Sequence, residues 1–163
     1  MIHLETKRLI LRNVRPRDAV TMFDYRNNEI CARYQRGQTK DLEGIQALTQ
    51  RRQYDTLTTT DNAMVAVALK ATGEMIGEIV VMPNYDCFSL GYTFHYAHHR
   101  KGYAFEALSC LIEKLHSLQP DWKFISFTET ENIPSQKLLL KLGYTDMGYI
   151  EKLDSQMFGK YLK

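Results

Sequence analysis

The sequence predicts a mixed α/β fold in which helices flank one mostly antiparallel sheet. Three observations lead to this prediction. Strand-like segments follow one another between residues 63 and 96, a run with helical spacing follows at 102–118, and strands then alternate with a helix to the end of the chain. A meander of strands followed by a crossover helix places antiparallel and parallel neighbours in one sheet.

The N-terminal third predicts one strand and two helices. A strand is expected at 8–13, with Leu9 and Leu11 on one face and Ile10 on the other. Pro16 and Asp18 then begin a helix that runs to about Arg33 and is interrupted by the polar residues 26–28. Thr39 is expected to cap a second helix. The inward face of that helix consists of Leu42, Ile45, Leu48 and Thr49. Both helices are candidates to line a substrate groove.

The middle of the chain predicts a three-stranded meander. Strands are expected at 63–69 and 75–82, joined by a hairpin turn at 71–74. A third strand, at 88–96, follows a turn that contains Pro83. This strand leads into the helix at 102–118.

The C-terminal part predicts a strand, a helix and two further strands. A strand at 123–128 precedes a helix at 135–142, which Gly143 ends in the position expected for a C-terminal cap. A strand is expected at 144–152, and the tail at 156–162 is a candidate for a final strand at the edge of the sheet.

Composition restricts the class of protein. Hydrophobic residues make up 44% and charged residues 25%, and 21 Lys+Arg against 19 Asp+Glu argue against nucleic acid as the main partner. No apolar run is long enough for a membrane span, and the N-terminus lacks the apolar core of a signal peptide. The three cysteines, Cys31, Cys87 and Cys110, fit a reduced, cytoplasmic protein, as packing residues or, alternatively, one as a nucleophile. We expect a single domain over 1–163, as a monomer or homodimer.

The start of the helix at 102–118 has the features of an anion site. It is preceded by Arg100, Lys101 and Gly102, which offer positive charge and backbone donors but no side-chain acceptor to cap the helix. The alternative is a surface helix start capped by water. The strands at 88–96 and 123–128 should be parallel neighbours, and parallel strands can splay apart so that a ligand reaches this helix start.

Several short motifs in order resemble the landmarks of the GNAT superfamily of acyl-CoA-dependent N-acyltransferases. The resemblance covers nearly the whole chain, and the N-terminal segment 4–12 is similar to the branch that includes ribosomal-protein N-terminal acetyltransferases. The motifs are Leu90-Gly91-Tyr92, Arg100-Lys101-Gly102-Tyr103-Ala104 with Glu106-Ala107, Asn132-Ile133-Pro134-Ser135, and Leu142-Gly143-Tyr144.

The resemblance implies that acetyl-CoA is the cosubstrate and that the sheet splays at 88–96 and 123–128. The pantetheine arm would pair with the strand at Phe94, His95 and Tyr96, and Asn132 would either cap its helix or contact the coenzyme. The loop that would bind the pyrophosphate through backbone amides consists of His99, Arg100, Lys101, Gly102, Tyr103 and Ala104.

The chain departs from the family pattern at two places. His99 and Arg100 stand where the family usually has Gln or Arg and then, often, Gly, so Arg100 either changes the geometry of the loop or reaches a phosphate. Leu139 stands where many members have a tyrosine that protonates the departing thiolate. Ser135 is the candidate substitute, and its alternative role is to bond a backbone N–H at the helix start.

The implied reaction is direct attack of a neutral amine on an acetyl thioester, which requires removal of a proton from the amine. Candidate bases are Glu78, Glu151 and Asp154. The histidines at 95, 98 and 99 lack the spacing and the fourth ligand of a zinc site, so no metal is expected. The acceptor is a small-molecule amine or a protein N-terminus. A catalytically silent acyl-CoA-binding or interaction module on the same fold is the alternative.

Overall fold

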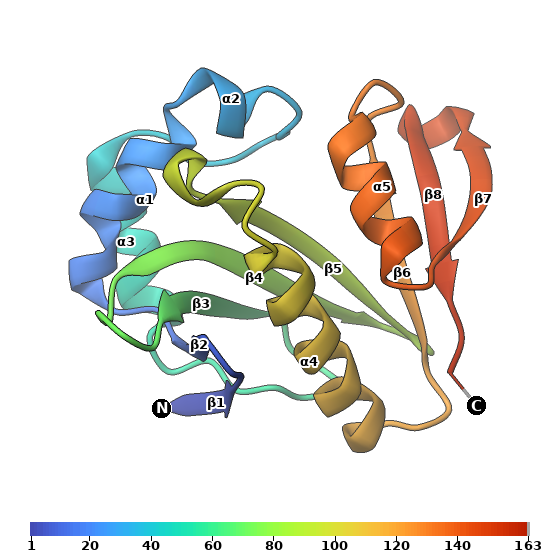
Figure 1. Cartoon of the computed structure of the whole chain (residues 1–163), viewed down its shortest axis with the longest axis horizontal. Coiled ribbons are helices and arrows are strands. Elements are labelled where there is room, and N and C mark those ends of the chain that lie inside the picture. The colour runs from blue at the N-terminus through green and yellow to red at the C-terminus, as the bar shows by residue number, and fades with distance from the viewer. Residues whose placement is uncertain (163) are drawn as a thin grey trace.

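The computed structural model describes residues 1–162 and contains an eight-stranded sheet with the order β1-β2-β3-β4-β5-β6-β8-β7 (Figure 1). The predicted mixed α/β class is confirmed. The strands are β1 (Ile2–Glu5), β2 (Leu9–Asn13), β3 (Ala63–Leu69), β4 (Met75–Asn84), β5 (Cys87–Phe94), β6 (Lys123–Thr128), β7 (Thr145–Ile150) and β8 (Ser155–Lys160). The helices are α1 (Ala19–Arg26), α2 (Glu29–Ala32), α3 (Leu42–Arg52), α4 (Tyr103–Leu118) and α5 (Ile133–Lys141), with 3-10 turns η1 (Pro16–Asp18), η2 (Tyr96–His98) and η3 (Glu151–Leu153).

The predicted splay between β5 and β6 is present. These strands run parallel and pair only at Cys87–Lys123, Phe88–Phe124 and Ser89–Ile125. Beyond this point β5 continues against β4, while β6 continues against β8. In Figure 1 the two strands meet near one end and their backbones diverge from there. We call the region between the diverging strands β5 and β6 the wedge.

Helices cover opposite faces of the sheet because each has one apolar side. The side chains of Leu108, Leu111 and Leu115 from α4 are buried in a core with residues of β2 to β6, β8 and α5. On the other face, Met22 of α1 and Ile45 of α3 pack in a second core against β3 and β4. Figure 1 shows α4 and α5 on one side of the sheet and α1 and α3 on the other. Within residues 1–162, no helix is long and apolar enough to cross a membrane.

The N-terminal prediction needs two corrections. A short strand, β1, precedes the predicted one and pairs with β2. The predicted interruption at 26–28 is present: α1 ends at Arg26, and the side chain of Asn28 accepts hydrogen bonds from the N–H groups of Ile30 and Cys31 and thereby starts α2 as a separate helix. The cap of α3 is Asp41, which accepts from the N–H of Gly44, and not the predicted Thr39.

The C-terminal strand is also placed differently from its prediction. β8 lies between β6 and β7, so β7, and not the tail, forms this edge of the sheet. The physical reason is the burial that each strand supplies: Phe158 of β8 is 1% exposed, whereas most side chains of β7 face solvent. Tyr96, which was predicted within the third strand, belongs to η2.

Candidate active site

Beyond Ser89, the edge of β5 that faces β6 has side chains beside it in place of a neighbouring strand. Each alternate carbonyl along this edge accepts a hydrogen bond from a side chain of another segment, so these side chains satisfy the carbonyls that no neighbouring strand reaches. The pairs are Ser126 Oγ to Leu90 O at 3.0 Å, Gln35 Nε2 to Tyr92 O at 3.2 Å, and His99 Nε2 and Cys31 Sγ to Phe94 O at 2.6 and 3.2 Å.

Helix α4 begins at Gly102 without a side-chain cap from any residue that the structure describes. Gly102 has φ +80°, a conformation that favours glycine, and a Cβ at this position would meet only the Arg8 guanidinium, at 3.4 Å. Arg100 also adopts positive φ, at +62°. The loop therefore has the left-handed geometry at Arg100 that was predicted to be costly for a residue with a side chain. The first amides of α4 are open to an anion.

The β1–β2 turn holds this helix start from one side. The Glu106 carboxylate accepts from Thr6 Oγ1 at 2.5 Å, from the Arg8 N–H at 2.9 Å and from Arg8 Nε at 2.7 Å. Arg8 also donates from Nη1 to the carbonyl of Lys101 and lies over the ring of Tyr103. A cavity of about 390 Å³ adjoins the same place and is lined in part by Lys7, Arg8 and Lys70, so its walls carry positive charge.

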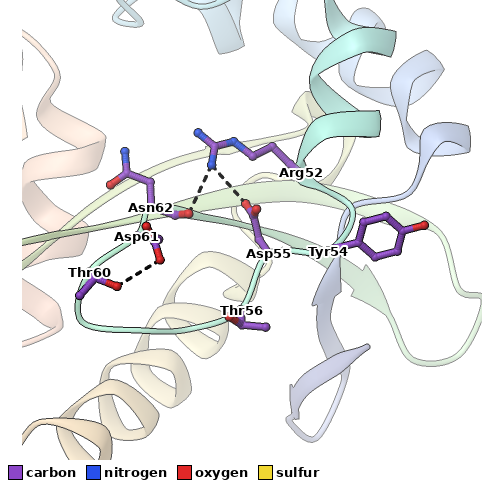
Figure 2. Close-up of a pocket in the computed structure, with 7 residues that line it drawn as sticks. All are labelled: Arg52, Tyr54, Asp55, Thr56, Thr60, Asp61 and Asn62. Carbon is purple, nitrogen blue, oxygen red and sulfur yellow. Dashed lines mark hydrogen bonds and ion pairs between the residues drawn. The ribbon is translucent and has the colours of Figure 1, made fainter.

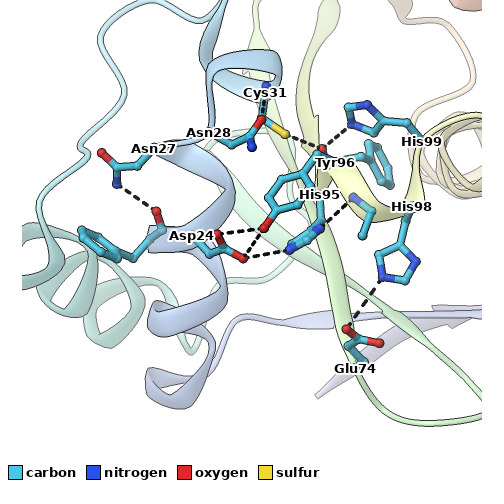
Figure 3. A network of polar contacts seen from close by, with 12 residues as sticks. Asp24, Asn27, Asn28, Cys31, Glu74, His95, Tyr96, His98 and His99 are labelled. Carbon is cyan, nitrogen blue, oxygen red and sulfur yellow. Dashed lines mark hydrogen bonds and ion pairs between the residues drawn. The ribbon is translucent and has the colours of Figure 1, made fainter.

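Several predicted coenzyme residues belong to a polar network that ties the loop before α4 to α1 (Figure 3). His95 Nδ1 accepts from the N–H of Ala97 at 3.0 Å, so Nε2 carries the proton and donates to Asp24 Oδ2 at 3.1 Å. The Tyr96 hydroxyl also donates to Asp24, and the Tyr96 ring stacks on His95 with centroids 4.1 Å apart. The side chains of His95 and Tyr96 thus point toward α1, while the His95 backbone donates its N–H to the Ile76 carbonyl and accepts from the N–H of His98.

This histidine-rich segment holds no metal cluster. No group of three or more His, Cys, Asp or Glu in residues 1–162 is arranged to bind a metal ion. Its imidazoles contact backbone groups and carboxylates instead, as His99 does with the carbonyl of Phe94.

Asn132 and Ser135, the two site residues predicted at the start of α5, have different contacts in the structure. Asn132 is the helix cap, since its Oδ1 accepts from the N–H of Ser135 at 3.3 Å. The Ser135 side chain makes no capping bond, and its Oγ lies 2.5 Å from the hydroxyl of Tyr92 on β5. Leu139, at the place where many relatives have a tyrosine, is buried in the core with 1% exposure. The Ser135 side chain is therefore found in contact with Tyr92 and not in the capping role, while its role as an acid stays a prediction.

Glu78, the first candidate base, is buried and fully engaged. Its carboxylate accepts from Arg26 Nη2 at 2.6 Å, from Arg26 Nε at 2.9 Å and from the Tyr25 hydroxyl at 2.7 Å. Burial, and then the charge of Glu78, raise the pKa of Tyr25 well above its usual value. Both oxygens of Glu78 are occupied in joining α1 to β4, so the carboxylate is not placed to accept a proton from an amine.

The other two candidate bases lie at the turn between β7 and β8. Glu151 is exposed in η3, and Asp154 follows it with φ +46°. The Asp154 carboxylate accepts from the Tyr149 hydroxyl at 2.6 Å. This hydrogen bond, together with the charge of Asp154, raises the pKa of Tyr149. Asp154 thus presents a largely exposed carboxylate at this turn.

Arg36 is a functional candidate that sequence reasoning missed. From the loop after α2, it donates to Glu129 Oε1 at 2.9 Å, to the Leu153 carbonyl at 3.0 Å and to the Asp154 carbonyl at 2.7 Å. Arg36 therefore connects this loop, the end of β6 and the β7–β8 turn across the wedge. No motif surrounds Arg36 in the sequence, and its partners are 93, 117 and 118 residues away, so no local pattern could indicate these contacts.

A polar cavity of about 560 Å³ lies apart from this site. It is formed by the connection between α3 and β3, where Arg52 bonds the carbonyl of Asn62 and pairs with Asp55 (Figure 2). It contains none of the predicted site residues. The wedge, with the uncapped helix at one end and the β7–β8 turn at the other, is the candidate active site.

Comparisons with known proteins agree with this geometry. Residues 8–145 match the family model described as acetyltransferase (GNAT) domain. YnaD of Bacillus subtilis, an uncharacterized N-acetyltransferase, is 25% identical over 154 residues, which cover 93% of this chain and 87% of the relative.

Solved structures of acetyltransferases share the fold. A GNAT-family acetyltransferase from Bacillus anthracis superposes with a TM-score of 0.82 at 18% identity and with 98% and 96% coverage of the two chains. RimL, a ribosomal L7/L12 alpha-N-protein acetyltransferase solved in complex with coenzyme A, gives a TM-score of 0.79 at 13% identity and 99% and 98% coverage. Since the family model spans most of the sequence and the fold agrees, the chain belongs to the GNAT acetyltransferase family and is an acetyltransferase enzyme.

Proposed function

We propose that this enzyme transfers an acetyl group from acetyl-CoA to a primary amine by direct attack. The observation that carries the proposal is that the unpaired edge of β5 runs into the uncapped start of α4. An extended arm with amide groups can pair with such an edge, and phosphates bind at a helix start with free N–H groups. RimL, which has the same fold, was solved with coenzyme A.

The residues present fit coenzyme A. Gly102 leaves the backbone accessible, because a Cβ there would find only one neighbour, and the cavity beside α4 is lined in part by the cations Lys7, Arg8 and Lys70. The pantetheine arm would lie along Phe94, His95 and Tyr96, where the Phe94 carbonyl already accepts from His99 and Cys31 and the His95 backbone is bonded within the chain. The loop His99 to Ala104, which includes Arg100, Lys101 and Tyr103, would hold the phosphates. Asn132 contributes indirectly, by shaping the start of α5.

The chemistry assigns separate roles to the two ends of the wedge. The coenzyme supplies an activated acetyl thioester. Ser135 gives a proton to the departing sulfur, near the positive end of α5. We assign the base to Asp154, because its carboxylate is exposed at the turn that Arg36 fastens to the wedge. Carboxylates at the same turn favour the approach of a cationic amine, which Asp154 then deprotonates.

The acceptor is a small-molecule amine or a protein N-terminus. Thiol release from acetyl-CoA, measured over a panel of peptides with different N-termini and of polyamines and amino acids, tests this proposal. Turnover on one class identifies the acceptor. Tight coenzyme binding without turnover on any amine would instead support a catalytically silent acyl-CoA-binding module.

The coenzyme site is tested by Gly102→Glu, which places a carboxylate at the proposed anion site. Calorimetry should show loss of coenzyme A binding while the circular dichroism spectrum stays unchanged. Gly148→Glu is the matched control, since Gly148 also has positive φ, at +100°, with nothing within 4 Å of a Cβ, and lies on β7. Unchanged affinity in Gly102→Glu would mean that the phosphates bind elsewhere.

A further inference from the structure

A hydrogen bond between two hydroxyl groups crosses the wedge. Tyr92 lies on β5, on one side of the splay, and Ser135 lies in the first turn of α5, which follows β6 on the other side. The Tyr92 hydroxyl and Ser135 Oγ are 2.5 Å apart, at the short end of the range for O–H···O hydrogen bonds. The two halves of the sheet are therefore connected at the residue proposed to act as the acid.

The surroundings keep Tyr92 protonated and in place. Burial raises the pKa of Tyr92 to about 12, against a smaller opposing effect of the bond with Ser135. The ring packs near Phe94, and the backbone carbonyl of Tyr92 accepts from Gln35. Tyr92 is thus a phenol and not a phenolate, and its O–H is within hydrogen-bond distance of the oxygen of Ser135, where either hydroxyl can donate.

Ser135 alone is a poor acid, because an aliphatic hydroxyl holds its proton more tightly than a phenol does. Its own N–H is committed to Asn132, so the backbone of this residue cannot support charge on Oγ. A donor directed at Oγ would stabilise the negative charge that develops there as the proton leaves. Tyr92 is the side chain in hydrogen-bond contact with this oxygen.

We infer that Tyr92 is a positioning residue that orients Ser135 and relays a proton through it to the departing sulfur. This inference rests on the proposed function. As the bond between the acetyl carbon and sulfur breaks, the Ser135 proton forms the S–H bond and the Tyr92 proton passes to Ser135 Oγ. Water then returns a proton to the phenolate. Leu139, at the position on α5 where a tyrosine was expected from the family, is buried in the core. In this proposal the phenol is instead that of Tyr92 on β5, which acts through Ser135 on α5.

Steady-state kinetics of Tyr92→Phe, Ser135→Ala and the double variant test the relay. Tyr92→Phe should lower kcat by about 10- to 100-fold, since general acid catalysis contributes on this scale, with KM for acetyl-CoA changed less than about twofold. The double variant should be no slower than Ser135→Ala, because both residues act on one proton. Unchanged kcat in Tyr92→Phe, or multiplicative losses in the double variant, would overturn the inference.

The matched control is Tyr144→Phe. Tyr144 is another buried tyrosine of the same core, and no hydrogen bond joins it to Ser135 in the part of the chain that the structure describes. This variant should keep the wild-type kcat. A loss equal to that of Tyr92→Phe would show that removal of any core hydroxyl slows the enzyme, which also contradicts the relay.

A second readout does not depend on the acceptor amine. The relay predicts that bound coenzyme A has a lowered thiol pKa, because Ser135 and Tyr92 stabilise the thiolate. Ultraviolet titration of the thiolate should show this pKa rising in both Tyr92→Phe and Ser135→Ala. If the wild type binds coenzyme but acetylates no amine, the proposed function fails while this titration still decides the role of Tyr92. An unshifted titration in the variants contradicts the relay.

Discussion

Arg8 Nε and Glu106 Oε1 lie 2.7 Å apart and join the β1–β2 turn to the first turn of α4. The pair is separated by 98 residues in the sequence. Because Arg8 neutralises the charge of Glu106, this carboxylate does not repel an anion at the helix start. Arg8 also donates a hydrogen bond to the Lys101 carbonyl. The N-terminal hairpin is therefore part of the proposed coenzyme site.

Replacing Arg8 should weaken coenzyme binding more than it weakens the fold. We expect Arg8→Ala to raise the dissociation constant for coenzyme A by about tenfold, or about 1.4 kcal/mol, because Glu106 then faces the phosphates unpaired. Arg8→Lys should give an intermediate value, since a lysine keeps the charge but not the planar guanidinium that bonds both the Glu106 carboxylate and the Lys101 carbonyl. Calorimetry measures both constants. Equal affinity in Arg8→Ala and wild type would show that the Arg8–Glu106 ion pair has no role in the site.

The Arg8–Glu106 ion pair should also make the stability of the fold depend on pH. Partial burial acts to raise the pKa of Glu106, but the hydrogen bonds from Thr6 and Arg8 prevail and hold it below its usual value. A carboxylate whose pKa is lowered by folding adds stability that is fully present above its unfolded pKa of about 4.3 and is lost as pH falls through the folded value. Urea unfolding from pH 6 to acid should therefore show a smaller loss of stability for Glu106→Gln than for wild type. Parallel curves would contradict this linkage.

Glu78 should behave as a structural residue. Because Arg26 and Glu78 are only 4% and 2% exposed at the side chain, Glu78→Gln leaves a buried guanidinium without its counter-charge and should cost about 3–5 kcal/mol of unfolding free energy. Adding Arg26→Met should recover part of that loss. Chemical denaturation measures these changes. A Glu78→Gln protein of normal stability with abolished turnover would instead identify Glu78 as the base.

Asp154 and Glu151 can be separated by conservative changes. Asp154→Asn keeps a side chain that tolerates the left-handed conformation and should reduce kcat by about 100-fold, with the loss largest at low pH. Glu151→Gln should retain much more activity, because its exposed side chain is not held at the wedge. The pH profile of kcat/KM for the amine is the measurement. The reverse order of losses would assign the base to Glu151.

Arg100 should show opposite effects on stability and on binding. Arg100→Gly relieves the positive φ and should stabilise the fold by about 1 kcal/mol, while affinity for coenzyme A falls if the guanidinium contacts a phosphate. Tyr85→Gly is the control, because Tyr85 has φ +57° and is 92% exposed in the β4–β5 turn. It should gain similar stability with unchanged affinity. Unchanged affinity in Arg100→Gly would place its side chain in solvent.

Much of the architecture was predictable from local patterns. Helical spacing of apolar residues identified α4, and the strands predicted at 63–69 and 123–128 have the bounds of β3 and β6 in the structure. Gly102 and the missing cap before α4 were visible as well, because they depend on the residue types of one short segment. The short motifs along the chain predicted the family that the comparisons confirm.

The tertiary structure decided which distant groups meet. Tyr92 and Ser135 are 43 residues apart, and Arg36 reaches partners more than 90 residues away. β8 took the inner position beside β6 because it could bury Phe158. Glu78 pairs with Arg26 because the fold buries these two side chains together, and its carboxylate is therefore not free. The sequence by itself determined the elements and the helix start, through interactions between near neighbours, whereas these contacts depend on how the folded sheet brings remote segments together.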